Sequence, residues 1–195
     1  DNATSCSSEN ALVILDAVYD EAIAALEAEG AWRCSPEERE NVRDRLWQNG
    51  ALNRAVIAKD AAVLADVFGL PRAARPSSFF LVEQDAVGGK HSFADEKLSL
   101  VLTVYRARDW QDAKRIVDEV LAVCGRGHSV GLHSSDDSRA SDLAASTDVV
   151  RVLINQPHTF GNGGSFENAL PFTLSMGCGT WAGNTIDENL NWRHF

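Results

Sequence analysis

The sequence has 195 residues, of which 45% are hydrophobic, and a formal net charge of −10 at pH 7. This length and composition predict one globular domain, residues 1–195, with a full hydrophobic core. The acidic charge argues against a nucleic-acid partner, because proteins that bind a phosphate backbone usually present a basic face. No apolar stretch approaches the roughly 18 to 20 uncharged residues of a membrane-spanning helix, so we also expect no membrane partner.

The N-terminal stretch places Cys6 among serines, directly before the apolar run 11–18. Apolar residues with a helical period over 9–29, followed by Gly30, predict a helix that leads straight from Cys6. A cysteine at a helix N-terminus lies at the positive end of the helix dipole, which favours the nucleophilic thiolate. Cys6 is therefore the candidate nucleophile. The alternative is that it is a structural, unreactive cysteine.

Two more helices have recognisable boundaries. The Ser-Pro-Glu-Glu sequence at 35–38 is a capping box with proline at the first helical position. It predicts a helix through Trp47 that stops at Asn49 and Gly50. A shorter helix is expected from Asp60 to Phe68, ending at Gly69.

From residue 77 onward, short apolar runs alternate with helical patterns. Asp109 is the expected N-cap of the longer of these helices. The predicted elements are strands at 77–84, 97–107, 128–134 and 149–156, and helices at 110–124 and 138–145. Strands that alternate with crossover helices indicate an α/β fold, with three αβα layers and a mainly parallel sheet.

Residues 158–195 are rich in glycine and asparagine, with aromatic residues interspersed. Glycine lets a substrate approach the backbone closely. Because aromatic side chains are unfavourable in a solvated tail, we expect a packed, functional loop rather than a tail. The aromatic residues concerned are Phe160, Phe166, Phe172, Trp181 and Trp192.

The four cysteines, Cys6, Cys34, Cys124 and Cys178, lie far apart. They form no Cys-x-x-Cys pair and no histidine is spaced with them for zinc, so we expect no metal site. Together with the enzyme-like composition, this favours a reducing cytoplasm as the location.

Four segments in order carry a resemblance to a known family. They are the start of the chain with Cys6 followed by Ser-Ser-Glu-Asn, HSFADEKLSLVLTVYRARDWQDA at 91–113, GHSVGLHS at 127–134 and GCGTWAGNTIDENL at 177–190. Together these segments resemble the aldehyde dehydrogenase superfamily. Within it they are most similar to the coenzyme A-acylating branch, which includes sulfoacetaldehyde dehydrogenases and the acetaldehyde dehydrogenase part of bifunctional aldehyde/alcohol dehydrogenases.

The resemblance implies roles for individual residues. Cys6 matches the catalytic cysteine, and Glu96 matches the glutamate that holds the nicotinamide-side ribose hydroxyls. Leu98, where many non-acylating relatives have Phe, is implied to contact the cofactor, which is NAD or NADP. Leu100 also departs from the family, whose members usually have Pro there. For His128 and His158, structural roles are favoured over contact with substrate or with the phosphates of coenzyme A.

The implied reaction is the oxidation of a small-molecule aldehyde through a cysteine thiohemiacetal and a thioester, which coenzyme A releases as acyl-CoA. Two alternatives stay open: hydrolytic release of a free acid, and a non-catalytic interaction domain. The resemblance further implies a C-terminal catalytic domain that lacks its N-terminal NAD-binding domain and its last oligomerisation strand. The isolated chain is therefore expected to be inactive, and the parent protein to be a homo-oligomer.

Overall fold

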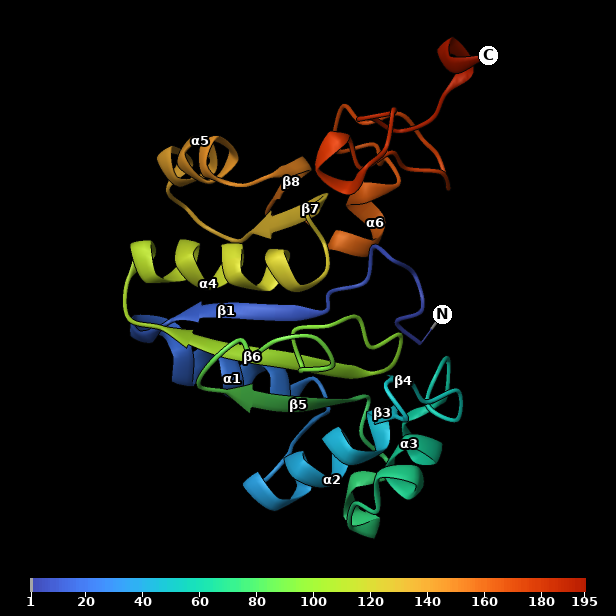
Figure 1. Ribbon diagram of the computed structural model, residues 1–195. Coiled ribbons are helices and arrows are strands. Elements are labelled where there is room, and N and C mark those ends of the chain that lie inside the picture. Colours follow the sequence, from blue (N-terminus) through green and yellow to red (C-terminus); the bar gives the residue numbers. More distant parts are fainter. Residues whose placement is uncertain (1) are drawn as a thin grey trace. The chain divides into compact units, whose positions relative to one another are not determined.

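The structure, a computed structural model, describes residues 2–195. The chain divides into two compact units, Asp1–Cys124 and Gly125–Phe195, and Asp1 lies outside the described residues (Figure 1). None of the helices within residues 2–195 combines the length and the apolar character needed to cross a bilayer.

The first unit contains a four-stranded sheet in which every neighbouring pair is parallel. The order across the sheet is β1 (Ala11–Leu15), β6 (Val101–Ala107), β5 (Phe79–Gln84) and β2 (Ala31–Arg33). Parallel neighbours need crossover connections, which helices provide here. The predicted α/β class with a mainly parallel sheet is thus confirmed.

Helices cover both faces of this sheet. Helix α4 (Trp110–Val123) runs alongside β1 in Figure 1 and packs on one face against Val13 and Tyr105. Helix α1 (Tyr19–Ala28) packs on the other face against Leu81 and Val104, which are fully buried. Burying a side chain of this size stabilises the fold by about 1.5–3 kcal/mol. These contacts give the first unit the predicted αβα layers.

Helices α2 (Pro36–Leu46) and α3 (Ala61–Phe68) form a second part of the core with Phe80 and Val82 of β5. The predicted capping box is present, since Glu38 N–H donates to Ser35 Oγ at 3.2 Å and Ser35 N–H donates to Glu38 Oε2 at 2.7 Å. Helix α2 ends one residue before its predicted range. Trp47 belongs instead to the hairpin of β3 (Trp47–Gln48) and β4 (Ala51–Leu52).

The predicted helix over 9–29 is wrong in its first half. Residues Ala11–Leu15 are strand β1, a 3-10 turn follows at Asp16–Val18, and helix α1 begins only at Tyr19. A continuous apolar run fits a buried strand as well as a helix, and here pairing with β6 decides the outcome. Cys6 therefore precedes a strand, and the helix-dipole argument for its reactivity does not hold.

The second unit contains a parallel pair, β7 (Gly127–Leu132) and β8 (Val149–Ile154). Helices α5 (Asp137–Ser146) and α6 (His158–Asn162) pack against β8. Residues 163–195 form loops with two 3-10 turns, Thr180–Ala182 and Trp192–His194, and one antiparallel bridge between Met176 and Asn189.

Candidate active site

Cys6 and Glu96 lie at the same edge of the four-stranded sheet. Cys6 shortly precedes β1 and Glu96 shortly precedes β6, and these two strands are parallel neighbours. Both residues are exposed. We call residues 5–10 the Cys6 segment and residues 93–98 the Glu96 segment. The structure thus brings the two sequence-predicted site residues to the amino edge of one sheet, on adjacent segments.

Hydrogen bonds from Asn10 join the two segments. The Asn10 Nδ2 amide donates to the carbonyl oxygens of Ala94 and Asp95, each at 3.2 Å. In the opposite direction, Lys97 Nζ donates to Asn10 O at 2.9 Å and to Asn10 Oδ1 at 2.7 Å. The end of the Cys6 segment is therefore fixed to the Glu96 segment by four hydrogen bonds.

Lys97 is a functional candidate that the sequence analysis missed. Its side chain is 1% exposed, and Nζ makes a third hydrogen bond to Phe93 O at 2.9 Å. Burial lowers the pKa of Lys97 to about 7, although the charges of Asp95 and Glu96 oppose that shift. The sequence gives little signal for this role, because Lys97 directly follows two carboxylates and its main partner, Asn10, is distant in sequence.

The turn at Leu98 is strained. Leu98 has φ of 44°, in the left-handed region that a bulky residue rarely occupies, and Leu98 O accepts a hydrogen bond from Ala58 N–H at 3.2 Å. Strained residues of this kind concentrate at functional sites. The strain lies two residues after Glu96, at the position that the sequence analysis associated with the cofactor.

A turn built by serine presents Cys6. Ser7 N–H donates to Ser5 Oγ at 3.2 Å, Ser8 N–H donates to Ser5 O at 2.9 Å, and Ser7 is buried. Asn2, farther upstream, donates through Nδ2 to Asp60 Oδ1 at 2.8 Å. Cys6 therefore lies exposed on a segment that is attached at both ends.

The other thiols of the first unit have different surroundings. Cys34 is buried, and burial raises the pKa of its thiol to about 12. Cys124 is exposed as a residue, but partial burial of its thiol and the nearby charges of Asp95 and Glu96 raise its pKa.

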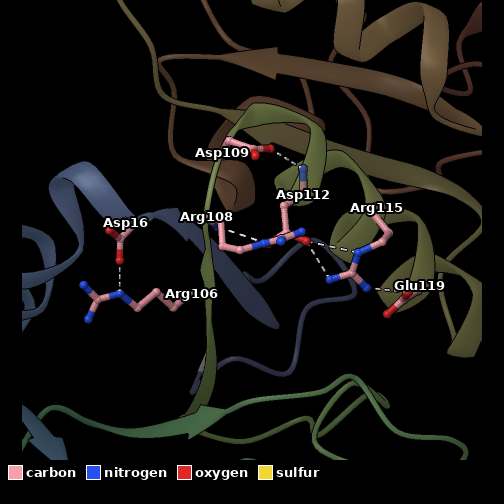
Figure 2. A network of polar contacts seen from close by, with 7 residues as sticks. All are labelled: Asp16, Arg106, Arg108, Asp109, Asp112, Arg115 and Glu119. Carbon is pink, nitrogen blue, oxygen red and sulfur yellow. Dashed lines mark hydrogen bonds and ion pairs between the residues drawn. The ribbon is translucent and has the colours of Figure 1, made fainter.

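An ion-pair network occupies the opposite edge of the sheet, where β6 leads into α4 (Figure 2). The Asp112 carboxylate accepts hydrogen bonds from Arg108 N–H at 3.1 Å and from the Arg115 guanidinium at 2.7 Å. These contacts, with the main-chain N–H of Arg108 foremost, hold the pKa of Asp112 well below its usual range. Arg106 pairs with Asp16 across the ends of β6 and β1. Open parallel sheets commonly bind ligands at the carboxyl edge, but here the candidate residues lie at the amino edge.

In the second unit, two histidines converge on Ser129. The Ser129 hydroxyl lies 2.6 Å from His128 Nδ1 and 2.8 Å from His158 Nε2, and it accepts a hydrogen bond from Asn162 Nδ2 at 3.0 Å. Burial, with the charges of Arg151 and His158, lowers the pKa of His128 to about 4. His128 is therefore neutral near pH 7.

Buried polar side chains hold the C-terminal loops in place. Arg151, 2% exposed, donates to Asn189 Oδ1 at 2.8 Å, to His128 O at 2.9 Å and to Gly177 O at 2.5 Å. Asn189 Nδ2 in turn donates to Asn162 O at 2.9 Å. The order in these loops thus comes from polar contacts to the backbone.

The prediction that the aromatic residues of these loops are packed is wrong in this structure. All five of them are exposed, from 50% for Trp181 to 99% for Phe166. The sequence argument was that aromatic side chains are unfavourable in solvent. Phe166 and Phe172 do pack edge to face on each other, with ring centroids 5.3 Å apart, but both stay exposed. The five residues are Phe160, Phe166, Phe172, Trp181 and Trp192.

No group of three or more His, Cys, Asp or Glu side chains within residues 2–195 is arranged to hold a metal ion.

Comparisons with known proteins match the chain over its whole length. Sulfoacetaldehyde dehydrogenase (acylating) of Cupriavidus necator is 45% identical to it, over 100% of this chain and 40% of that protein. The bifunctional aldehyde-alcohol dehydrogenase of Escherichia coli is 33% identical, over 100% of this chain and 22% of that protein. This chain is a homologue of the acylating aldehyde dehydrogenases.

Solved structures support the same relationship. The crystal structure of an acetylating aldehyde dehydrogenase from Geobacillus thermoglucosidasius matches 99% of this homologue with a TM-score of 0.93 and 28% identity, and the match covers 42% of that chain. A scan against protein-family models finds no match. The resemblance inferred from the four sequence segments is confirmed. The chain spans about 40% of the length of the sulfoacetaldehyde dehydrogenase (acylating) that it matches.

Proposed function

We propose that the protein containing this chain oxidises an aldehyde with NAD or NADP and releases the product as an acyl-CoA. The observation that carries the proposal is the 45% identity, over the whole chain, to a sulfoacetaldehyde dehydrogenase that is named as acylating. The exposed thiol of Cys6, on a segment hydrogen-bonded to the segment of Glu96, supports the same reaction.

In this proposal Cys6 is the nucleophile. Its thiolate adds to the aldehyde carbonyl carbon, a C–S bond forms, and the carbonyl electron pair moves to oxygen. The main-chain N–H of Cys6 is the proposed donor from this chain to that oxyanion. Loss of hydride from the same carbon leaves a thioester on Cys6. The thiolate of coenzyme A then attacks the thioester, the bond to Cys6 breaks, and acyl-CoA and the Cys6 thiolate separate.

The residues at the amino edge fit a nicotinamide cofactor. Glu96 is exposed, and its carboxylate has two oxygens to accept hydrogen bonds from a pair of ribose hydroxyls. Leu98 offers an apolar side chain two residues later, on the left-handed turn. When bound, the nicotinamide supplies the hydride acceptor. Glu96 and Leu98 are therefore the proposed cofactor-binding residues.

Both units are proposed to belong to one catalytic domain, residues 1–195. The continuous match of 99% of the chain to part of a single acetylating aldehyde dehydrogenase supports this assignment. We also propose a cytoplasmic, homo-oligomeric parent protein with no nucleic-acid partner. The net charge of −10 supports the last point, and gel filtration of the full-length protein would test the oligomeric state.

Product identity tests the proposed reaction. Full-length protein is incubated with sulfoacetaldehyde, the substrate in the name of the similar protein, and with NAD or NADP, in the presence and absence of coenzyme A. We expect steady turnover and an acyl-CoA product only when coenzyme A is present. Turnover at the full rate without coenzyme A, with a free acid as product, would show hydrolytic release instead.

Substitution of the thiol tests the nucleophile. Cys6→Ser should lower the oxidation rate by at least about a thousandfold, because an alcohol replaces the attacking thiolate. Cys178→Ser, a change at a cysteine of the second unit, is the control and should keep the rate within about threefold. Activity that survives Cys6→Ser would contradict the proposal.

A further inference from the structure

Lys97 occupies a site built for an ammonium group. Its Nζ lies within 2.9 Å of three acceptors, Asn10 O, Asn10 Oδ1 and Phe93 O. An ammonium group has three N–H donors and no acceptor, so this site satisfies all of them. A lysine that is 1% exposed is unusual unless its charge is compensated, and these contacts with the nearby carboxylates of Asp95 and Glu96 compensate it.

The acceptors belong to two segments that are distant in sequence. Asn10 ends the Cys6 segment and precedes β1, whereas Phe93 begins the Glu96 segment and precedes β6. Lys97 itself is bonded covalently to Glu96. One buried side chain therefore connects the strand leading from the candidate nucleophile with the peptide that carries the candidate ribose-binding carboxylate.

We propose that Lys97 is a positioning residue that holds the Cys6 segment against the Glu96 segment. The effect of Lys97 on catalysis rests on the proposed function. The contact that it makes between the two segments does not, because all of its partners lie in this chain. Without Lys97, Asn10 Oδ1 loses its donor in a partly buried site, and Asn10 O and Phe93 O keep only their hydrogen bonds from Thr103, which is costly. The segments then separate more often, and both candidate site residues lose their fixed places.

Thr103 offers a matched control. Its Oγ1 donates to the same Phe93 O at 2.7 Å, and Thr103 is fully buried. The link of Thr103 to Asn10 is a main-chain hydrogen bond, from Thr103 N–H to Asn10 O at 3.3 Å, and a change of side chain leaves it in place. Thr103→Val removes the hydroxyl hydrogen bond to Phe93 O with little change of shape, so it reports the cost of a lost buried bond without loss of the connection.

Amide hydrogen exchange of the 195-residue chain measures the connection directly. In Lys97→Met, exchange of peptides covering 5–10 and 93–98 should accelerate at least about tenfold, whereas Thr103→Val should stay within about threefold of the parent chain. Exchange in the second unit, residues 125–195, serves as an internal reference. Equal acceleration in the two variants would overturn the proposal.

Asn10→Ala provides a second route if Lys97→Met does not fold. It removes Oδ1 as an acceptor and Nδ2 as a donor while it keeps the lysine. The same two peptides should again exchange at least about tenfold faster. In the double variant the effects should be less than additive, because both changes break one network. Unchanged exchange in Asn10→Ala would contradict the proposed connection.

Kinetics of the full-length protein distinguish a Lys97 that positions the candidate site residues from one that only stabilises the fold. Lys97→Met should raise the KM for NAD or NADP and slow the acylation burst, each by at least about tenfold, while Thr103→Val stays within about threefold. If Cys6→Ser is active, the proposed function fails, and the exchange data still decide whether Lys97 holds the segments. If Cys6→Ser is inactive but the two variants behave alike in kinetics, the catalytic role of Lys97 is refuted.

Discussion

At the scale of single residues, surroundings distinguish the cysteines from one another. Cys6 is exposed on a serine turn, whereas Cys34 lies in the core formed by α2 and α3. Since the thiolate is the nucleophile, a thiol whose pKa is raised by burial reacts slowly near neutral pH. The structure therefore supports Cys6 as the reactive thiol through exposure, and not through the helix dipole that the sequence suggested.

We predict an order of alkylation among these thiols. With iodoacetamide at pH 7, Cys6 should be modified faster than Cys124, because the raised pKa of Cys124 lowers its thiolate fraction. Cys34, with a pKa of about 12 and a buried side chain, should react slowest. Peptide mapping after timed labelling gives the rates. Cys6→Ser should leave the other rates unchanged, and earlier labelling of Cys124 would count against a catalytic Cys6.

His128 should make stability depend on pH. Its folded-state pKa is lowered to about 4, so between about pH 6.5 and 4 the unfolded chain binds a proton that the folded chain does not. The free energy of unfolding should therefore fall by roughly 1–3 kcal/mol as the pH drops through this window, and stay level above it. Urea unfolding at several pH values measures the slope. His128→Asn should reduce the slope, whereas the same change at His133 should not. An equal slope in His128→Asn would refute the assignment.

At the scale of elements, the sequence predicts the features that neighbouring residues determine. It does not predict those that depend on residues distant in the chain. The capping box of α2 and the left-handed Gly69 after α3 are determined by neighbouring residues, so the sequence predicts them. The strand β1 depends on pairing with β6, so an apolar run alone does not distinguish it from a helix. The role of Lys97 likewise depends on Asn10, which is 87 residues away. Glu96 was found only through family resemblance, and Cys6 was first proposed from a helix start that proves to be strand β1.

Gly127 controls the docking of the C-terminal loops on β7. It has φ of 87°, and a Cβ there would collide with Cys178 O. Gly127→Ala should therefore cost at least about 2 kcal/mol, from the left-handed backbone and the overpacking together. Limited proteolysis should cleave residues 163–195 faster than in the parent chain. Gly89→Ala, where a Cβ meets no atom within 4 Å, is the control. Equal stability of the two variants would contradict the packing described here.

At the scale of the whole molecule, the chain spans only part of its homologues. It matches 40% of the sulfoacetaldehyde dehydrogenase of Cupriavidus necator, so the catalytic cysteine is proposed to work with residues outside these 195.

A polypeptide limited to these 195 residues should react with iodoacetamide at Cys6 but should not oxidise aldehyde catalytically. Cys6 should be alkylated as in the full-length protein, yet aldehyde and NAD should yield no NADH above the background, because the proposed reaction is expected to use residues from the part of its homologues that this chain does not match. Absorbance at the NADH band, with full-length protein as the positive control, measures this. Robust NADH formation by the 195 residues would show that they hold a complete site.

The hydrogen-bond acceptors of Lys97 Nζ should determine which positions vary together among homologous sequences. Asn10 contributes both a main-chain and a side-chain oxygen, whereas Phe93 contributes only its carbonyl group. Any residue at position 93 supplies that carbonyl, so drift among apolar residues is tolerable there. A loss of the asparagine, in contrast, removes the reason to bury a lysine. Across homologous sequences, positions 10 and 97 should therefore change together, while position 93 varies independently of both.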